Sequence, residues 1–398
     1  MSEISMFLEE VSSAIMLTPA DMFIVLLLLI LFLILFLLTL MGYFNLLLSI
    51  ASFSFPNARV MALGNPCTDP ATVADLLQSH SVHELAEKLR QFGYAVETVD
   101  LEDPSHVERY LESVYRDELE HLEMAAPEGL KPFLQAYGRR FEAAQLKVLI
   151  RAVHAGVPPD QIAEAVTPAG GLSPPLLRKA ADARDLDELV GMLAETGYGR
   201  PLLEALPDHH GRGDTLVLET AVDRVVMEDL DGSIMRTDTL ISAPPAALLA
   251  VYADAANTRI LLRAARDRID REQVIRSLIP YGKDLSWPLL LKLAELEGPT
   301  QILARIEETA LHSAIENSIA EFEQTGSFVP VEYALDQFLF ETARTLETIY
   351  HHGPGPILKF LVGREYELRN IRTIYWGVRE QAPLPAIRQH LILAGGTA

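Results

Sequence analysis

After residue 60 the chain carries one pattern of polar residues three times, and this repetition restricts its possible folds more than any other feature. An acidic residue, an amide three positions later and a basic residue two positions after that recur at spacings of 112 and 113 residues. Self-similarity at a fixed period indicates that one structural unit is built several times. The nine residues are Glu142, Gln145 and Lys147, then Asp254, Asn257 and Arg259, then Glu367, Asn370 and Arg372.

Two further segments repeat in step with this pattern. The first has equivalent acids at Glu108, Glu219 and Glu332, each followed four positions later by a second acid, namely Glu112, Asp223 and Asp336. The second has the landmarks Leu85, Leu189 and Ile302, whose unequal spacing indicates loops of different length. The sequence therefore predicts three units of roughly 110 residues. Their predicted bounds are 57–166, 167–279 and 280–398, after an N-terminal segment over 1–56.

Each unit is predicted to be helical. Apolar residues within 141–153 keep the three-to-four spacing of an amphipathic helix. Ser81 with Glu84, and Asp185 with Glu188, have the spacing of capping boxes that begin helices. No segment alternates convincingly between apolar and polar residues, as a half-buried strand would. The predicted fold class is all-α.

The N-terminal segment contains twenty consecutive residues, 22–41, without a charge. A helix of that length spans roughly 30 Å, the thickness of the hydrocarbon core of a bilayer, so we predict one transmembrane helix. A cleaved signal peptide is the alternative, but acidic residues and no Lys or Arg precede the segment. The first basic residue, Arg59, follows the span. The positive-inside rule then predicts the cell membrane as location, with the body on the cytoplasmic side.

The composition excludes several classes of partner and site. The chain has 33 basic and 55 acidic residues, a net charge of −22, which repels nucleic acid phosphates. Its single cysteine, Cys67, excludes an intrachain disulfide framework and a cysteine-based zinc cluster. No phosphate-binding loop motif is present. We therefore expect no cofactor, no small-molecule substrate and no nucleic acid partner.

The repeated polar residues allow a structural and a catalytic interpretation. An enzyme usually needs one site, so two of three copies would be free to diverge, yet all three keep the same residue classes. A polar network that fixes the register of packed helices explains this better. The catalytic alternative is a membrane-tethered helical carboxylate metalloenzyme, with Glu118, His121 and the repeated acids as metal ligands. The histidine pairs at 209–210 and 351–352 are predicted to lie in loops.

Four stretches resemble a known family. They are "FPNARVMAL" at 55–63, "HELAEKLRQFGYA" at 83–95, "DELVGMLAETGYG" at 187–199 and, most specifically, "EYELRNIRTIYWGVREQAPLPAIRQHL" at 365–391. They are similar to the C subunit of the A-type ATP synthase, whose family includes the d subunit of the eukaryotic V-type ATPase. The resemblance covers roughly residues 55 to 394, and the leading apolar helix departs from the usual family pattern.

The resemblance implies a fold, a role and partners. It implies three helical domains related by pseudo-threefold symmetry that form a funnel-like socket, with no catalytic residues. One face would sit on the membrane-embedded ring of proteolipid subunits, and the concavity would grip the central stalk, so that rotation driven by ion flow reaches the ATP-making head. A membrane-anchored helical adaptor of another complex remains a third alternative.

Overall fold

The computed structural model describes residues 6, 19–96, 99–168, 170–306 and 309–395. Its internal contacts divide the chain into two compact units, Met1–Ser52 and Phe53–Ala398. The second unit is called the body below. Each unit is described by itself.

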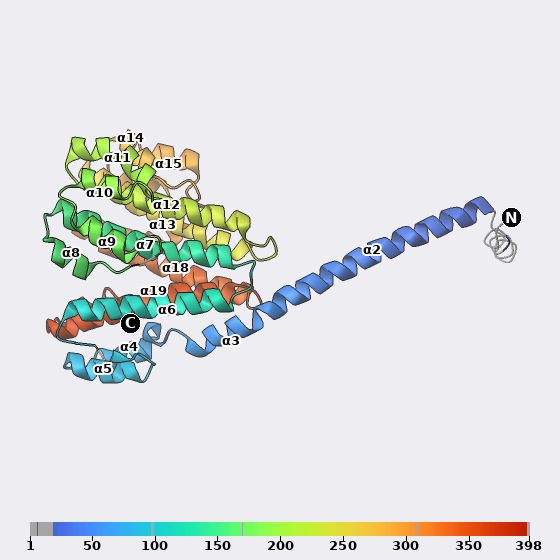
Figure 1. Ribbon diagram of the computed structural model, residues 1–398, viewed down its shortest axis with the longest axis horizontal. Helices are drawn as coiled ribbons and strands as arrows, with labels where there is room; N and C mark the ends of the chain where they lie inside the picture. The colour runs from blue at the N-terminus through green and yellow to red at the C-terminus, as the bar shows by residue number, and fades with distance from the viewer. Residues whose placement is uncertain (1–5, 7–18, 97–98, 169, 307–308, 396–398) are drawn as a thin grey trace. The chain divides into compact units, whose positions relative to one another are not determined.

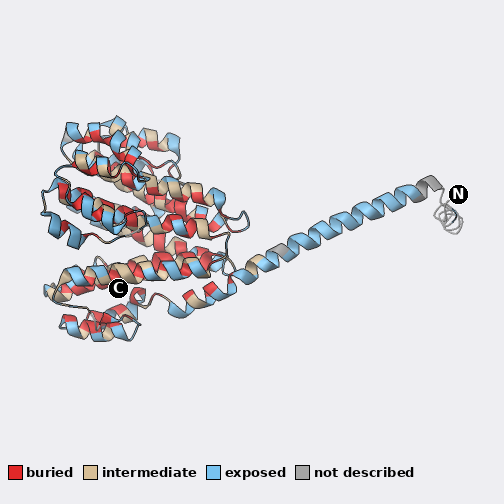
Figure 2. Cartoon of the chain, viewed as in Figure 1, coloured by how far each residue is buried: buried red, intermediate tan, exposed pale blue. Residues whose placement is uncertain are grey.

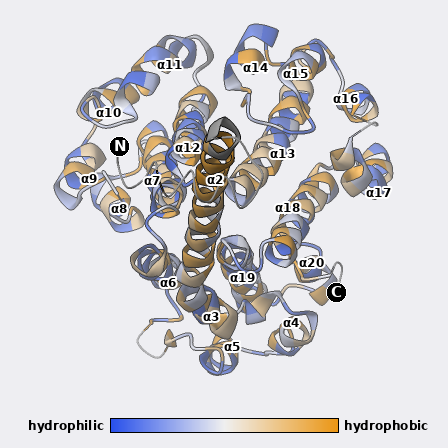
Figure 3. Ribbon diagram, turned by 90° about the vertical axis from the view of Figure 1, so that its right-hand side faces the viewer, coloured by the Kyte–Doolittle hydropathy of each residue, from blue (hydrophilic) through white to orange (hydrophobic). Residues whose placement is uncertain are grey.

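The first unit contains α2 (Pro19–Ser52), a helix of 34 residues. At 1.5 Å per residue it is about 51 Å long, which exceeds the hydrocarbon thickness of a bilayer. Its large apolar side chains from Phe23 to Leu48 are exposed (Figure 2), and the helix is hydrophobic along its length (Figure 3). Within the described residues, this apolar stretch is the one candidate membrane span by length and composition. The predicted apolar helix over 22–41 is confirmed as a helix and is longer than predicted.

The body is built from helices, as predicted, and its described residues form no extended strand (Figure 1). The helices that precede residue 213 are α3 (Ser54–Leu63), η1 (Pro66–Thr68), α4 (Pro70–Leu76), α5 (Val82–Arg90), α6 (Pro104–Ala125), α7 (Lys131–His154), α8 (Pro159–Ala165), α9 (Pro174–Ala181), α10 (Leu186–Met192) and α11 (Gly199–Arg212). Those that follow are α12 (Leu216–Arg236), α13 (Ala243–Asp267), α14 (Arg271–Ser277), α15 (Trp287–Leu293), α16 (Pro299–Arg305), α17 (Ala310–Thr325), α18 (Val329–Ile349), α19 (Gly355–Arg379) and α20 (Leu384–Arg388).

Six long helices form a closed ring within the body. They are α6, α7, α12, α13, α18 and α19, each of 21 to 25 residues. Each contacts the next in that order, and α19 contacts α6. The short helices lie outside this ring (Figure 3). Because the last long helix packs against the first, the N- and C-terminal parts of the body hold each other in place.

Local sequence sets the helix starts that the capping boxes predicted. Ser81 accepts the backbone N–H of Glu84 at 3.2 Å, and Asp185 accepts that of Glu188 at 2.8 Å. Each glutamate in turn accepts a backbone N–H just before its helix, from His80 and from Arg184. Both predicted starts are confirmed, since the orphan amide groups of a first helical turn need such acceptors.

The predicted loop position of the histidines at 209–210 is wrong. Both lie in the last turn of α11, which continues through Pro207 and stops at Gly213 in the left-handed conformation. The ring of His209 is buried and its Nδ1 lies 2.5 Å from the Asp214 carbonyl oxygen. Proline normally interrupts a helix, but α11 continues through Pro207, and His209 on its last turn is buried.

The core of the body consists of two clusters of buried apolar side chains. One joins residues of α3 to α13 with residues of α18 to α20, and the other joins residues of α13 to α18. Phe338 on α18 packs against both clusters. The repeat landmarks Leu85, Leu189 and Ile302 are all buried. Side-chain packing is therefore continuous around the ring.

Candidate functional site

The acid of the second repeat binds the backbone that leads into the third. Asp254 on α13 accepts three backbone hydrogen bonds from consecutive residues just before α15. The donors are the N–H groups of Lys283, Asp284 and Leu285, at 3.1, 2.9 and 2.9 Å. A carboxylate in this position fixes both the loop and the start of the helix that follows it.

The other two acids make equivalent contacts. Glu142 on α7 accepts a backbone hydrogen bond from Gly171, just before α9. Glu367 on α19 accepts the N–H of Cys67 at 2.9 Å, just before α4. With the predicted repeat bounds the contacts are cyclic: the first predicted repeat holds the second, the second holds the third, and the third holds the first.

Each amide holds the backbone 22 residues further along the chain. Asn257 both donates to the carbonyl and accepts the N–H of Ile279, at 2.7 and 2.8 Å. Asn370 does the same with Ile392, at 2.7 and 2.9 Å, and Gln145 accepts the N–H of Thr167 at 2.7 Å. Because amide side chains carry both a donor and an acceptor, they can satisfy both polar groups of one residue. These contacts fix the segment that returns from each short helix after the long one.

The basic residues pair with acids on the neighbouring long helix of the ring. The pairs are Lys147 with Asp223, Arg259 with Asp336 and Arg372 with Glu108. They join α7 to α12, α13 to α18 and α19 to α6, so each pair joins two of the predicted repeats. A second pair lies one helical turn further on in two of the junctions, Arg151 with Glu219 and Arg263 with Glu332.

The third junction differs from the first two. Trp376 occupies the position equivalent to Arg151 and Arg263, and its indole N–H lies 3.5 Å from Glu108. Arg372 binds this same Glu108, while Glu112 instead accepts a hydrogen bond from Gln145 at 3.1 Å. This junction has one basic residue fewer than the other two. Its base, Arg372, therefore pairs with the first acid of the neighbouring helix, one helical turn from the second acid that Lys147 and Arg259 contact.

The repeated acids are buried, which sets their electrostatics. Glu367 is fully buried, and Asp254 and Glu142 are less than a tenth exposed. Burial raises the pKa of all three carboxyls, and the hydrogen bonds that they accept oppose this rise. For Glu367 the guanidinium of Arg364, whose Nη1 lies 2.8 Å from Oε2, also opposes it. The hydrogen bonds that these acids accept, and for Glu367 the ion pair with Arg364, therefore offset the cost of burying their carboxyl groups.

Replacing Gly282 by alanine is expected to destabilise the second junction by about 1–3 kcal/mol. An added Cβ would lie 2.1 Å from Oδ1 of Asp254 and 3.1 Å from the Leu285 carbonyl oxygen. Urea unfolding would measure the loss. Gly191→Ala on α10 is the control, because nothing lies within 4 Å of its added Cβ. Equal stability of the two variants would contradict the tight fit at Asp254.

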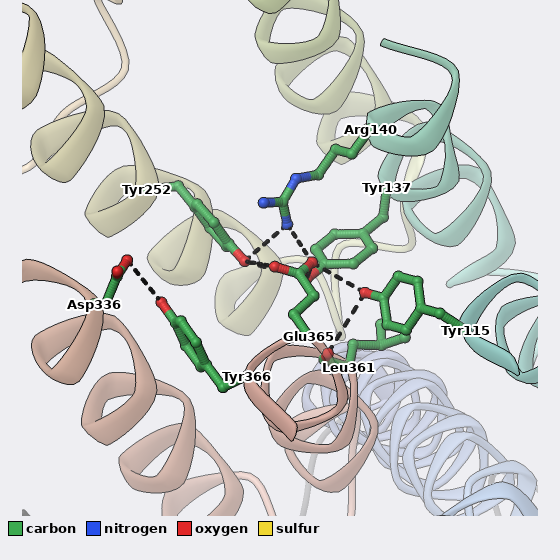
Figure 4. Close-up of polar contacts among 8 residues, drawn as sticks. All are labelled: Tyr115, Tyr137, Arg140, Tyr252, Asp336, Leu361, Glu365 and Tyr366. Carbon is green, nitrogen blue, oxygen red and sulfur yellow. Dashed lines mark hydrogen bonds and ion pairs between the residues drawn. The ribbon is translucent and has the colours of Figure 1, made fainter. Parts of the chain in front are cut away.

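A second polar cluster lies where the repeats meet at the centre of the ring (Figure 4). Arg140 on α7, Tyr252 on α13 and Glu365 on α19 are each two residues before the repeated acid, so they occupy equivalent positions. Arg140 Nη1 donates to Glu365 at 2.6 Å and to the Tyr252 hydroxyl at 2.8 Å. The Tyr252 hydroxyl donates to Glu365 at 3.2 Å. Three identical side chains would crowd or repel one another here, whereas a cation, a phenol and a carboxylate bind one another.

Two buried tyrosines complete this central cluster. The hydroxyls of Tyr115 on α6 and Tyr137 on α7 donate to Glu365 at 2.9 and 2.5 Å (Figure 4). The guanidinium of Arg140 lies over the rings of Tyr252 and Tyr137, at 4.4 and 5.0 Å from their centroids. Burial and the Glu365 carboxylate raise the pKa of both buried tyrosines well above its usual value. The phenols therefore stay protonated and remain donors.

Replacing Tyr115 by phenylalanine is expected to remove part of the alkaline instability of the protein. In the folded state burial raises the pKa of Tyr115, so the unfolded chain loses this proton first. Stability from this group is present below about pH 10 and is lost as pH rises from there towards the folded pKa, by about 1.4 kcal/mol at pH 11. Denaturant unfolding at pH 8 to 11 would compare the two proteins. Parallel stability curves would contradict this origin of the pH dependence.

The central cluster was missed by the sequence analysis. Residues of one class recur at the nine repeat positions, but at these three positions the class changes from base to phenol to acid. A comparison that seeks shared residue types cannot find such a site. The available signal was a mutually complementary set of side chains at one repeat position.

The proposed metal ligands have other partners. Glu118 lies 3.7 Å from Arg59, and His121 Nδ1 lies 2.6 Å from the Asp117 carbonyl oxygen. The repeated acids contact three different junctions. Across the part of the chain that the structure describes, no group of three or more His, Cys, Asp or Glu is arranged to hold a metal ion. The histidines at 351–352 lie in the turn between α18 and α19, as predicted.

Comparison with known proteins gives a consistent set of relatives. The family model described as ATP synthase (C/AC39) subunit matches residues 56–390. The A-type ATP synthase C subunit of Methanocaldococcus jannaschii is 27% identical over 392 residues, which covers 97% of each chain. The same subunit of Methanothermobacter thermautotrophicus is 27% identical over 338 residues, 84% of this chain and 86% of the relative. That of Haloferax volcanii is 26% identical over 272 residues, 66% of this chain and 74% of the relative.

The matches differ in how much of the first unit they cover. The family model begins at residue 56, after α2. The alignment with the Methanocaldococcus jannaschii protein covers 97% of the chain and so extends through the apolar segment. The central cluster and all nine repeat residues lie within the family match.

Proposed function

Because the chain belongs to the ATP synthase (C/AC39) subunit family, we propose that it is the coupling subunit of an A-type ATP synthase. The family is a non-catalytic subunit of the complex, and the protein is not an enzyme in its own right. In the proposed role it links the membrane ring of proteolipid subunits to the central stalk, so that ion-driven rotation reaches the ATP-making head. The family match over residues 56–390 is the observation that carries this proposal.

The role requires a body that transmits torque without yielding. We assign the nine repeat residues to a structural network that joins three helical domains, 57–166, 167–279 and 280–398, into a pseudo-threefold funnel. The cyclic hydrogen bonds of the acids and the ion pairs of the bases support this assignment, since each crosses a domain boundary. A closed ring resists splaying because every wall is held on both sides. The proteolipid ring would then turn the body and the bound stalk as one piece.

The location follows from α2 and the charges around it. In the proposed arrangement α2 spans the cell membrane and the body lies on the cytoplasmic side, since Arg59 is the first basic residue. Alkaline extraction of membranes is expected to leave the full chain in the pellet. Protease is expected to digest the body only in inverted vesicles. Digestion in right-side-out vesicles would overturn the orientation, and release by alkali would overturn the span.

Affinity purification of the full chain from detergent-solubilised membranes tests the role itself. Recovery of both proteolipid ring and central-stalk subunits is the expected result. Recovery of neither would overturn the rotary assignment and favour an adaptor of another complex. The variant Glu316→Leu, which changes an exposed residue of α17, is carried through the same purification as a control.

A further inference from the structure

Three of the long helices each turn one face toward the central cluster. Arg140 on α7, Tyr252 on α13 and Glu365 on α19 contact one another there (Figure 4). A side chain eleven residues further along the same helix points within about 20° of the same direction, because each residue turns an α-helix by about 100°. The residues that share these inward faces are Arg151, Arg263 and Trp376.

The inward faces become more exposed with distance from the central cluster. The side chains of Arg140 and Glu365 are about a quarter exposed. Those of Arg151 and Arg263 are more than half exposed, and Trp376 is 38% exposed although most of α19 is buried. The three faces have the exposure expected of the inner walls of the proposed funnel, which would open away from the central cluster.

The three walls differ in chemistry at the level of these exposed residues. Arg151 pairs with Glu219 of α12, and Arg263 pairs with Glu332 of α18. The third wall has Trp376 in place of a base. Two walls therefore offer an ion pair to a bound partner, and one wall offers the apolar surface of an indole.

The indole of Trp376 is held in place by its neighbours. Tyr375 packs edge-on against it, with ring centroids 5.7 Å apart, and the guanidinium of Arg379 lies 5.8 Å from its centroid. Its Nε1 lies 3.5 Å from Glu108. Tryptophans often dominate the energetics of protein interfaces, and one that is already held in place loses little conformational freedom when a partner binds.

We propose that Trp376 determines the orientation in which the central stalk docks in the funnel. Three nearly equivalent walls would offer the stalk three nearly equivalent orientations, a third of a turn apart. A stalk with one apolar side chain at this level places it against the indole and places polar side chains against the two ion pairs. Either other orientation would cover an ion pair with an apolar side chain, which costs desolvation without a replacement partner. This inference deepens the proposed function and rests on it.

Distances between two nitroxides test the orientation. The full chain is bound to purified central-stalk subunits of the same organism that carry one nitroxide on the foot of the stalk. The body carries the second nitroxide at one of three exposed positions, while the native Cys67 is fully buried and protected from labelling. Double electron–electron resonance is expected to give one distance for each body label, because the stalk has one orientation. The three labelled variants are Met124→Cys, Met235→Cys and Ile349→Cys.

Trp376→Arg makes the third wall like the other two, and each body label is then expected to give three distances. The variant is expected to fold, because arginine occupies the equivalent position in the other two junctions. Arg263→Trp makes the second wall like the third and is expected to give two distances. Trp287→Arg on α15 is the control, since Trp287 is as exposed as Trp376 but lies outside the ring of long helices. It is expected to keep one distance.

Loss of the indole is also expected to weaken binding. Trp376→Ala is expected to raise the dissociation constant for the stalk subunits about thirtyfold, the effect of removing an anchor residue from an interface. Trp287→Ala, the matched control, is expected to leave the dissociation constant unchanged. Equal affinity of the two variants would overturn the role of Trp376.

The outcomes separate this inference from the proposed function. One unchanged distance in both Trp376→Arg and Arg263→Trp would overturn the orientation proposal and leave the coupling role intact, since the stalk would still bind. Several distances in the unaltered complex would have the same meaning. Failure of the unaltered chain to bind the stalk subunits would overturn both proposals.

Discussion

Replacing Glu367 by leucine is expected to destabilise the body by about 3–5 kcal/mol, the cost of leaving a buried charge without its partner. Glu367 is fully buried and Arg364 is 6% exposed. Leucine fills the volume but leaves the Arg364 guanidinium without an anion and the Cys67 N–H without an acceptor. The same change also opens the contact between the last repeat and the first.

Urea unfolding followed by tryptophan fluorescence measures this loss, since the chain has two tryptophans, Trp287 and Trp376. Glu316→Leu makes the same substitution on an exposed face of α17 and is expected to change stability by less than about 0.5 kcal/mol. Adding Arg364→Leu to Glu367→Leu is expected to recover part of the loss, because a well-packed apolar pair can replace a buried ion pair. A loss no greater than that of the control would refute the role of Glu367.

Reversing the charge of Glu365 is expected to destabilise the centre of the ring by about 2–4 kcal/mol. Glu365→Arg places a second guanidinium beside Arg140 and removes the acceptor of Tyr115 and Tyr137. The side chains of Arg140 and Glu365 are 28% and 25% exposed, so solvent screening reduces the cost relative to a fully buried pair.

A double-variant cycle measures the coupling of this pair. Arg140→Glu alone is expected to be destabilising, and Arg140→Glu combined with Glu365→Arg is expected to recover at least half of the summed loss. The tyrosine donors around position 365 limit the recovery, because they favour an acid there. Additive losses in the double variant would show that the two charges do not interact, and would refute the central cluster as the contact that joins α7 to α19.

The fold could be predicted from the sequence where a few neighbouring residues determine the local structure by themselves. The capping pairs at 81–84 and 185–188 determine helix starts by themselves, and the uncharged run of 22–41 already has the length of a long apolar helix. The nine repeat residues were visible because each copy makes the same kinds of contact, from its acid and amide to backbone and from its base to an acid of another long helix. Family resemblance then supplied the identity that no motif supplied.

Other features depend on contacts between distant segments. The pairing of Arg372 with Glu108 joins residues 264 apart in the chain, and its one-turn shift follows from the tryptophan at 376. The central cluster depends on four helices meeting, α6, α7, α13 and α19, and a search for similar residues misses it because its residues are complementary. The histidines at 209–210 were misassigned because the stretch 207–214 has the composition of a loop, whereas α11 continues through Pro207 to Arg212.

The contact of Glu367 with Cys67 has a consequence for biosynthesis. It spans 300 residues, and α19 also packs against η1, α3, α5 and α6. A nascent chain that emerges from the ribosome N-terminus first therefore holds these early helices without their partner until α19 has been made. We expect the thiol of Cys67 to be open to alkylation during that interval and to become protected when α19 packs against these helices. Its reactivity in ribosome-bound chains of increasing length would time the completion of the fold.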